Sequence, residues 1–160
     1  MKFEEIKSLI EAEVPGAVLD EDKASSPATL IIHANQIVAV CELLHTNEKT
    51  YFDSLSCLTG LDNGEEKNTM EVIYNLYSIP YDLHLALKVE LDRSNPEIES
   101  VTGIWRTADW HEREAYDLLG IQFKGHPDLR RILLPDDWEG YPLRKDYVEQ
   151  EKYHDVKVKY

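Results

Sequence analysis

Strict alternation of apolar and polar residues is the clearest pattern along the chain. From Leu83 to Leu91 every second residue is Leu or Val, and His, Ala, Lys and Glu stand between them. The segment from Met70 to Leu76 alternates in a similar way, and residues 79–81 separate the two runs. Because successive side chains of a strand point to opposite faces, the pattern predicts an antiparallel hairpin with one face on a core and one in solvent.

Three other segments have the three- and four-residue spacing of apolar positions that is typical of amphipathic helices. The first starts at Phe3 and ends before the Pro15-Gly16 pair. The second covers 37–44, and the third covers 102–119 and ends at Gly120. These segments predict one short helix at the start of the chain, one in the first third and one in the last third.

The remaining segments predict short strands and irregular structure. Residues 28–32 and 51–59 read as strands, and 121–123 alternates only once. The last part of the chain contains several Pro and Gly residues and cannot be helical throughout. Cys41 lies in an apolar stripe and Cys57 in an apolar strand, so both are expected to be inert core thiols.

This order of elements predicts an α+β fold. We expect a two-layer domain, with helices packed on one face of a mixed or mostly antiparallel sheet and an extended C-terminal arm. A chain of 160 residues suits one domain. We therefore assign residues 1–124 to a single α+β body and residues 125–160 to an extended docking segment.

Composition narrows the classes of function. The formal net charge is −14, and residues 1–100 carry 19 acidic against 7 basic side chains. This charge disfavours nucleic-acid and direct membrane binding. No apolar stretch approaches the roughly 20 residues of a membrane span, and the two cysteines form no C-x-x-C motif. The first residues lack a targeting signal, so we expect a soluble protein of a reducing prokaryotic cytoplasm.

Motifs for independent catalysis are missing from the sequence. His111-Glu112 begins like the zinc motif H-E-x-x-H, but residue 115 is Ala. No nucleotide-binding glycine motif and no serine-nucleophile motif is present. We therefore expect no catalytic, cofactor-binding or metal-binding residue in this chain. A weaker alternative uses His111 or His126 with adjacent carboxylates as general acid and base, and it requires a cleft.

Charged residues are concentrated between positions 109 and 131. Helical spacing pairs Asp109 and Asp117 with Arg113, and such exposed pairs contribute only about 0.2–0.5 kcal/mol each. We expect a structural ion network that joins this helix to the following segment, because arginine binds carboxylates in a bidentate manner. The network comprises Glu112, Arg113, Glu114, Asp117, Arg130 and Arg131. If Glu112 and Glu114 are buried with arginine partners, Arg113→Ala costs roughly 3–5 kcal/mol; a solvated charged face is the equal alternative.

The segment after Pro135 interleaves aromatic residues with charges of both signs. Large aromatic rings and arginine are favoured at protein interfaces, so this segment is interpreted as a docking arm that orders on a partner. The alternative is a tail that packs on its own domain. The candidate docking residues are His126, Trp138, Tyr141, Arg144 and Lys145.

At these residues the sequence resembles a known family, the 30 kDa subunit of respiratory complex I, the NADH-quinone oxidoreductase. The family signature of Glu-Arg-Glu, an acidic residue, two apolar residues, His and Arg is filled here in every fixed position, by Glu112-Arg113-Glu114, Asp117, Leu118-Leu119, His126 and Arg130-Arg131. The runs 133–140 and 142–147 look like the family's closing segment, with Tyr141 where many members have His, and 52–62 is similar to a family strand. The likeness covers about residues 30–150.

The resemblance implies a cofactor-free structural subunit in the peripheral arm of proton-translocating NADH:quinone oxidoreductase, a translocase of the respiratory chain. FMN and iron–sulfur clusters then belong to partner subunits, which carry electrons from NADH to quinone. The implied partners are the homologue of the 49 kDa subunit and the iron–sulfur subunits. The implied place is peripheral, on the cytoplasmic side of the bacterial inner membrane, with membrane contact only through the complex. The alternative is the equivalent subunit of a membrane-bound hydrogenase or formate-hydrogenlyase complex.

Overall fold

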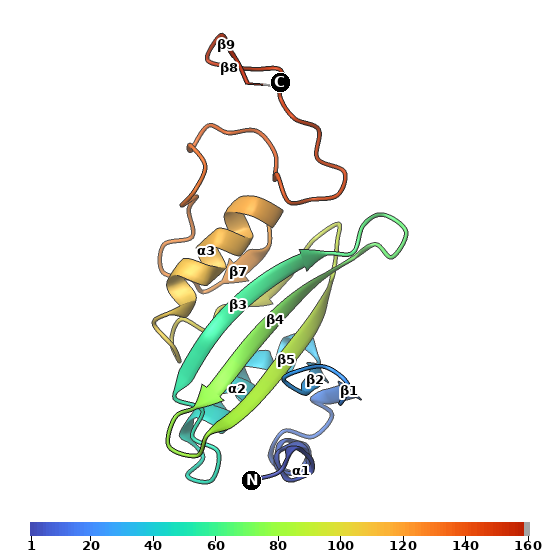
Figure 1. Ribbon diagram of the computed structural model, residues 1–160, viewed down its shortest axis with the longest axis vertical. Coiled ribbons are helices and arrows are strands. Elements are labelled where there is room, and N and C mark those ends of the chain that lie inside the picture. Colours follow the sequence, from blue (N-terminus) through green and yellow to red (C-terminus); the bar gives the residue numbers. More distant parts are fainter. Residues whose placement is uncertain (159–160) are drawn as a thin grey trace.

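A five-stranded sheet forms the centre of the computed structural model, which describes residues 1–158 (Figure 1). Its strand order is β1-β2-β5-β4-β3, and all neighbours are antiparallel except the parallel pair β2–β5. The sheet is therefore mixed and mostly antiparallel, as predicted. Its strands are β1 (Val18–Asp22), β2 (Thr29–Ile32), β3 (Ser54–Asp62), β4 (Thr69–Ser78) and β5 (Leu83–Asp92).

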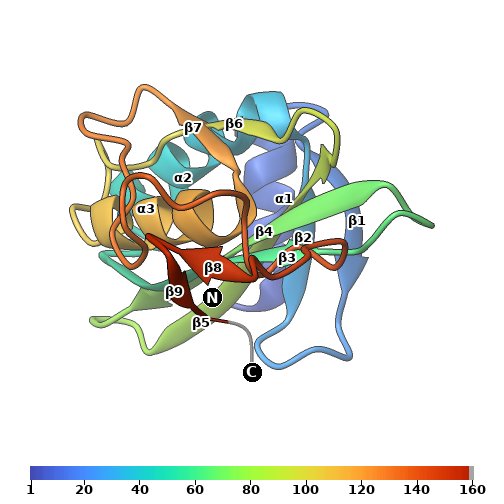
Figure 2. The same ribbon diagram turned by 90° about the horizontal axis from the view of Figure 1, so that it is seen from above.

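Three α-helices, α1 (Phe3–Glu13), α2 (Ile37–Thr46) and α3 (Ala108–Leu119), lie on one face of this sheet, and a short 3₁₀ turn (Ala34–Gln36) precedes α2 (Figures 1 and 2). The apolar stripes of the helices and the inner faces of the strands form one buried cluster. The predicted two-layer α+β architecture is confirmed.

The predicted hairpin is the best-defined part of the sheet. Strands β4 and β5 pair without a shift over their full length, and burial alternates along β4. Leu85, Leu87 and Val89 are buried, whereas His84 faces solvent on the other side. Period-2 patterning therefore predicted both the pairing and the core-facing side chains.

The third helix begins later than predicted, at Ala108 and not at Thr102. Residues 101–107 form turns, and the Trp105 indole N–H donates to the Phe52 carbonyl at 3.0 Å. Val101 and Trp105 are buried because they cover the core from a loop, which helical spacing alone cannot distinguish from a helix. The helix ends at Gly120, whose φ of +78° is the left-handed conformation expected there.

Several short strands were not predicted, and one prediction for a cysteine was wrong. Strand β1 is largely polar and exposed, and β6 (Glu97–Glu99) pairs in parallel with β7 (Gln122–Lys124). Cys41 is buried, and burial raises the pKa of its thiol. Cys57, however, is only partly buried, and its sulfur lies 3.2 Å from the Thr59 hydroxyl. A strand bulge between Leu55 and Cys57 turns this side chain away from the core.

The arm, residues 125–158, runs across the end of α3 and past the edge of the sheet (Figure 1). It contains no helix, and its only strands are the short pair β8 (Lys152–Tyr153) and β9 (Val156–Lys157). The division at residue 124 remains a prediction, and residues 159–160 lie outside the described part of the chain.

Candidate interface of helix α3 and the arm

Asp117 is the main attachment point of the arm. Its side chain is buried, and one carboxylate oxygen accepts hydrogen bonds from the amides of Ile132, Leu133 and Leu134 at 2.7–3.0 Å. The other oxygen accepts from Arg131 Nη1 at 2.7 Å. Burial alone would raise the pKa of the Asp117 carboxyl, but these donors offset that effect and hold the pKa below its usual value.

Arg131 fixes the first loop of the arm. Besides Asp117, its guanidinium donates to the carbonyl oxygens of Trp138 and Gly140 at 2.9 and 3.0 Å. It also lies over the Tyr141 ring, 5.4 Å from the centroid. Arg131, at the start of the loop 131–140, therefore joins helix α3 to the end of the same loop.

The C-terminus of α3 is the second attachment point. Arg144 Nε donates to the Leu119 carbonyl at 2.7 Å, and the Leu143 amide donates to the Leu118 carbonyl at 3.0 Å. A cation is favourable here because the last carbonyls of a helix carry partial negative charge. A side chain on Gly120 would come within 2.6 Å of the Tyr141 ring, so glycine also permits the close contact.

A third attachment, which the sequence analysis missed, joins the arm to the sheet. Arg93 binds both oxygens of Asp62, at 2.7 and 3.1 Å, and also reaches Asp146 at 2.6 Å. The Lys145 amide donates to Asp62 at 2.8 Å. The Arg93 guanidinium holds the pKa of Asp62 well below its usual value. The sequence contains one signal for this attachment: Arg93 is the only arginine among the first hundred residues.

Glu112 is buried, but it has no arginine partner. Its two oxygens accept from the Ser100 hydroxyl at 2.7 Å and the Val101 amide at 2.8 Å. No basic side chain pairs with it among residues 1–158. Burial raises its pKa to about 7, and the two hydrogen bonds only partly oppose this shift. Glu112 thus holds the segment before α3 in place as a buried acid.

The other network residues occupy different positions from those predicted. Arg113 makes no ion pair with Asp109 or Asp117; it donates to the backbone carbonyls of residues 130 and 131, each at 3.2 Å. Glu114 is exposed, and Arg130 pairs with Asp128 at the surface. The premise that Glu112 and Glu114 are buried with arginine partners is therefore wrong: Glu114 is exposed, and a hydroxyl and a backbone amide satisfy Glu112.

The predicted docking residues differ in accessibility. The His126 side chain has no exposed surface and lies 3.2 Å from the Asp109 carbonyl, so a direct docking role does not fit its placement. Trp138 and Tyr141 are half-buried, whereas Lys145 is exposed. The arm also exposes Leu133 and Val148.

The described residues offer no evident metal centre. Among residues 1–158, no three His, Cys, Asp or Glu side chains lie close enough together to hold one ion.

Known proteins are similar to this chain in sequence and in fold. A family model described as respiratory-chain NADH dehydrogenase, 30 kDa subunit, matches residues 30–153. The chain is 51% identical over 123 residues to the C subunit of NADH-quinone oxidoreductase from Chloroherpeton thalassium, a match that covers 76% of this chain but only 50% of that relative. It is 43% identical over 141 residues to the corresponding subunit of Chlorobium phaeobacteroides, with 88% and 84% covered.

Solved structures agree with the fold. The trypsin-resistant fragment of Nqo5 superposes with a TM-score of 0.54 at 28% identity, covering 64% of this chain and 82% of the fragment. A chain of the archaeal membrane-bound sulfane sulfur reductase superposes with a TM-score of 0.75 over 92% of this chain and 86% of that chain. Its identity is 22%, so this likeness shows the fold alone.

Proposed function

The chain belongs to the family of the 30 kDa subunit of respiratory-chain NADH dehydrogenase, and from this premise we propose that it is a structural subunit of proton-translocating NADH:quinone oxidoreductase. In this role it holds no cofactor. Partner subunits carry FMN and the iron–sulfur clusters, and this chain keeps them in fixed geometry for electron transfer to quinone.

The observation that carries the proposal is an arm that is firmly attached and yet exposes large apolar side chains among its charges. Holding an irregular segment in one conformation costs conformational entropy, and the buried Asp117 and the Arg93–Asp62 pair offset that cost. The attached arm exposes Leu133 to 62% and Val148 to 78%. An arm that is pre-ordered in this way binds a partner at a lower entropic cost.

We propose that the arm docks on the homologue of the 49 kDa subunit and on the iron–sulfur subunits beside it. Lys145 is the docking candidate that is exposed. Trp138, Tyr141 and Arg144 are half-buried, and Arg144 also lies over the Tyr141 ring. The proposed location is peripheral, on the cytoplasmic side of the cell membrane. Within residues 1–158, no helix has both the length and the apolar character needed to cross a bilayer.

Purification of the native assembly tests the proposal. Tagged chain isolated from membranes of the source organism should bring down flavin-, NADH-binding and iron–sulfur subunits, while the chain alone should contain no stoichiometric flavin or metal. The double variant Leu133→Glu, Val148→Glu should reduce partner recovery at least tenfold. Leu19→Glu is the matched control, because Leu19 is 61% exposed on β1. Equal recovery with both variants would contradict docking through the arm.

The same purification tests whether the chain belongs to the alternative assembly. Co-purifying nickel–iron hydrogenase subunits would assign the chain to a membrane-bound hydrogenase or formate-hydrogenlyase complex. Flavin and NADH-binding subunits would exclude that assignment.

A further inference from the structure

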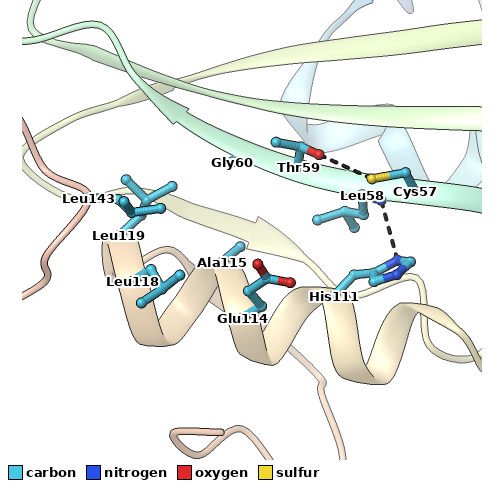
Figure 3. Close-up of a pocket in the computed structure, with 10 residues that line it drawn as sticks. All are labelled: Cys57, Leu58, Thr59, Gly60, His111, Glu114, Ala115, Leu118, Leu119 and Leu143. Atoms are coloured by element: carbon cyan, nitrogen blue, oxygen red, sulfur yellow. Dashed lines mark hydrogen bonds between the residues drawn. The ribbon is translucent and has the colours of Figure 1, made fainter. Parts of the chain in front are cut away.

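A groove lies between α3 and β3, the edge strand of the sheet. Figure 3 shows His111, Glu114 and Ala115 of α3 below the strand, with Leu119 and Leu143 at the other end of the groove. The helix and strand approach closely because residue 60 is glycine: a Cβ atom there would lie 2.6 Å from Leu119 Cδ1.

Hydrogen-bonding groups of the β3 backbone point into this groove. In an antiparallel pair, alternate residues direct their N–H and C=O groups away from the partner strand. The Leu58 amide points away from β4 and donates to His111 Nδ1 at 3.3 Å. Gly60, two residues further on, faces the same side, and within residues 1–158 no side chain or loop bonds its N–H or C=O. The strand edge therefore has unpaired backbone groups at Gly60.

The two ends of the edge are already occupied by the protein itself. His111 covers the edge at Leu58, and the Lys145 amide binds the Asp62 carboxylate beyond Gly60. An unpaired edge promotes pairing with other chains, and proteins usually cover it. Here the cover is interrupted at Gly60, which limits an added strand to a short contact.

Size and charge indicate what the groove accepts. Its volume is about 190 Å³, which is below the roughly 300–1,000 Å³ of small-molecule sites and suits one or two side chains. Ala115, Leu118 and Leu143 provide an apolar lining, and the exposed Glu114 stands at the rim. Glu114 makes no ion pair within residues 1–158, so a basic side chain would complement it.

We propose that an extended segment of a neighbouring subunit adds to the edge of β3 at Gly60. Its backbone pairs with the Gly60 N–H and C=O, an aliphatic side chain enters between Leu118 and Leu143, and a Lys or Arg reaches Glu114. This is recognition by strand addition, in which backbone hydrogen bonds provide affinity and pockets provide specificity. The proposal rests on the proposed function only for the existence of a multisubunit assembly.

Cys57 is a native reporter for this groove, and Cys41 is its internal control. Cys57 lines the groove and is partly exposed, whereas Cys41 is fully buried. N-ethylmaleimide should therefore alkylate Cys57, but not Cys41, in the isolated full chain. In intact cells and in the purified assembly, alkylation of Cys57 should be at least tenfold slower. Hydrogen exchange of the Gly60 amide should slow by a similar factor.

Variants separate groove binding from docking of the arm. Glu114→Lys should restore alkylation of Cys57 in the assembly to within twofold of the isolated chain, while other subunits still co-purify. Leu118→Glu should do the same if its thermal midpoint is native. Glu90→Lys, exposed on the opposite face of the sheet, should leave Cys57 protected.

Each alternative result has a defined meaning. Co-purifying subunits with rapid alkylation of Cys57 would overturn strand addition and leave the proposed function standing. Protection of Cys57 without slower exchange at Gly60 would also overturn it, since the groove would be covered without pairing. Protection in an isolated chain that sediments as a dimer would assign the groove to a second copy. Rapid alkylation in cells with no co-purifying subunit would overturn both proposals.

Discussion

Glu112 offers the sharpest test of the electrostatics of α3. It lies on the buried face of the helix, between a hydroxyl and an amide, without a cation. Glu112→Gln keeps the shape of the side chain and both hydrogen bonds, because the amide group can donate to the Ser100 oxygen while its carbonyl accepts from Val101. The substitution removes only the buried negative charge.

The expected size of the effect follows from the pKa of Glu112, which is about 7 in the folded chain against 4.5 for a free side chain. Because folding raises this pKa, the stabilising contribution is complete below pH 4.5 and is lost as pH rises through 7. The full difference between the two pKa values corresponds to roughly 3 kcal/mol of unfolding free energy. Between pH 5.5 and 8.5 the part contributed by Glu112 should fall by about 2 kcal/mol.

Urea unfolding followed by tryptophan fluorescence at pH 5.5, 6.5, 7.5 and 8.5 measures this change. The measured quantity is the unfolding free energy of Glu112→Gln minus that of the natural chain. This difference should rise by about 2 kcal/mol from pH 5.5 to pH 8.5. Glu114→Gln is the matched control, since it removes an exposed carboxylate from the same helix. A constant difference for Glu112→Gln, or a growing loss at high pH, would refute a buried carboxyl that resists ionisation.

Other substitutions test the attachments of the arm and helix. Asp117→Asn should cost roughly 3 kcal/mol in urea unfolding and speed tryptic cleavage of the arm; unchanged cleavage would contradict this attachment. Gly120→Ala should cost roughly 1–3 kcal/mol more than Gly125→Ala, because both have positive φ but only Gly120 faces a ring; equal losses in thermal unfolding would contradict the contact. Arg113→Ala should cost about 1–2 kcal/mol, since only carbonyls lose a donor; a loss above 3 kcal/mol would require a carboxylate partner.

Local patterns predicted the elements whose two faces differ in environment. Strands β4 and β5 were found because one face is buried and the other is solvated, which imposes alternation. Strand β1, by contrast, has a largely exposed acidic sequence at the sheet edge, so it carries no apolar pattern. The parallel pairing of β2 with β5 joins residues more than fifty positions apart, and no local spacing encodes it.

The candidate interface was predicted in outline but not in its contacts. Charge density correctly drew attention to α3 and to the arm, yet most attachments join side chains to backbone groups, which have no sequence signature. The burial of Glu112 did have a signal: it shares a helical stripe with Ala108, Ala115 and Leu119, all buried. A carboxylate on an apolar stripe should therefore have been assigned to the core.

Electron transfer in membranes that lack this chain tests the proposed structural role most directly. Deletion in the source organism should abolish NADH-dependent quinone reduction, while NADH oxidation by an artificial acceptor that takes electrons from the flavin subunit continues. Quinone reduction should return with the full chain and fail to return with the Leu133→Glu, Val148→Glu variant. Undiminished quinone reduction after deletion, or turnover of NADH by the purified chain alone, would contradict the account.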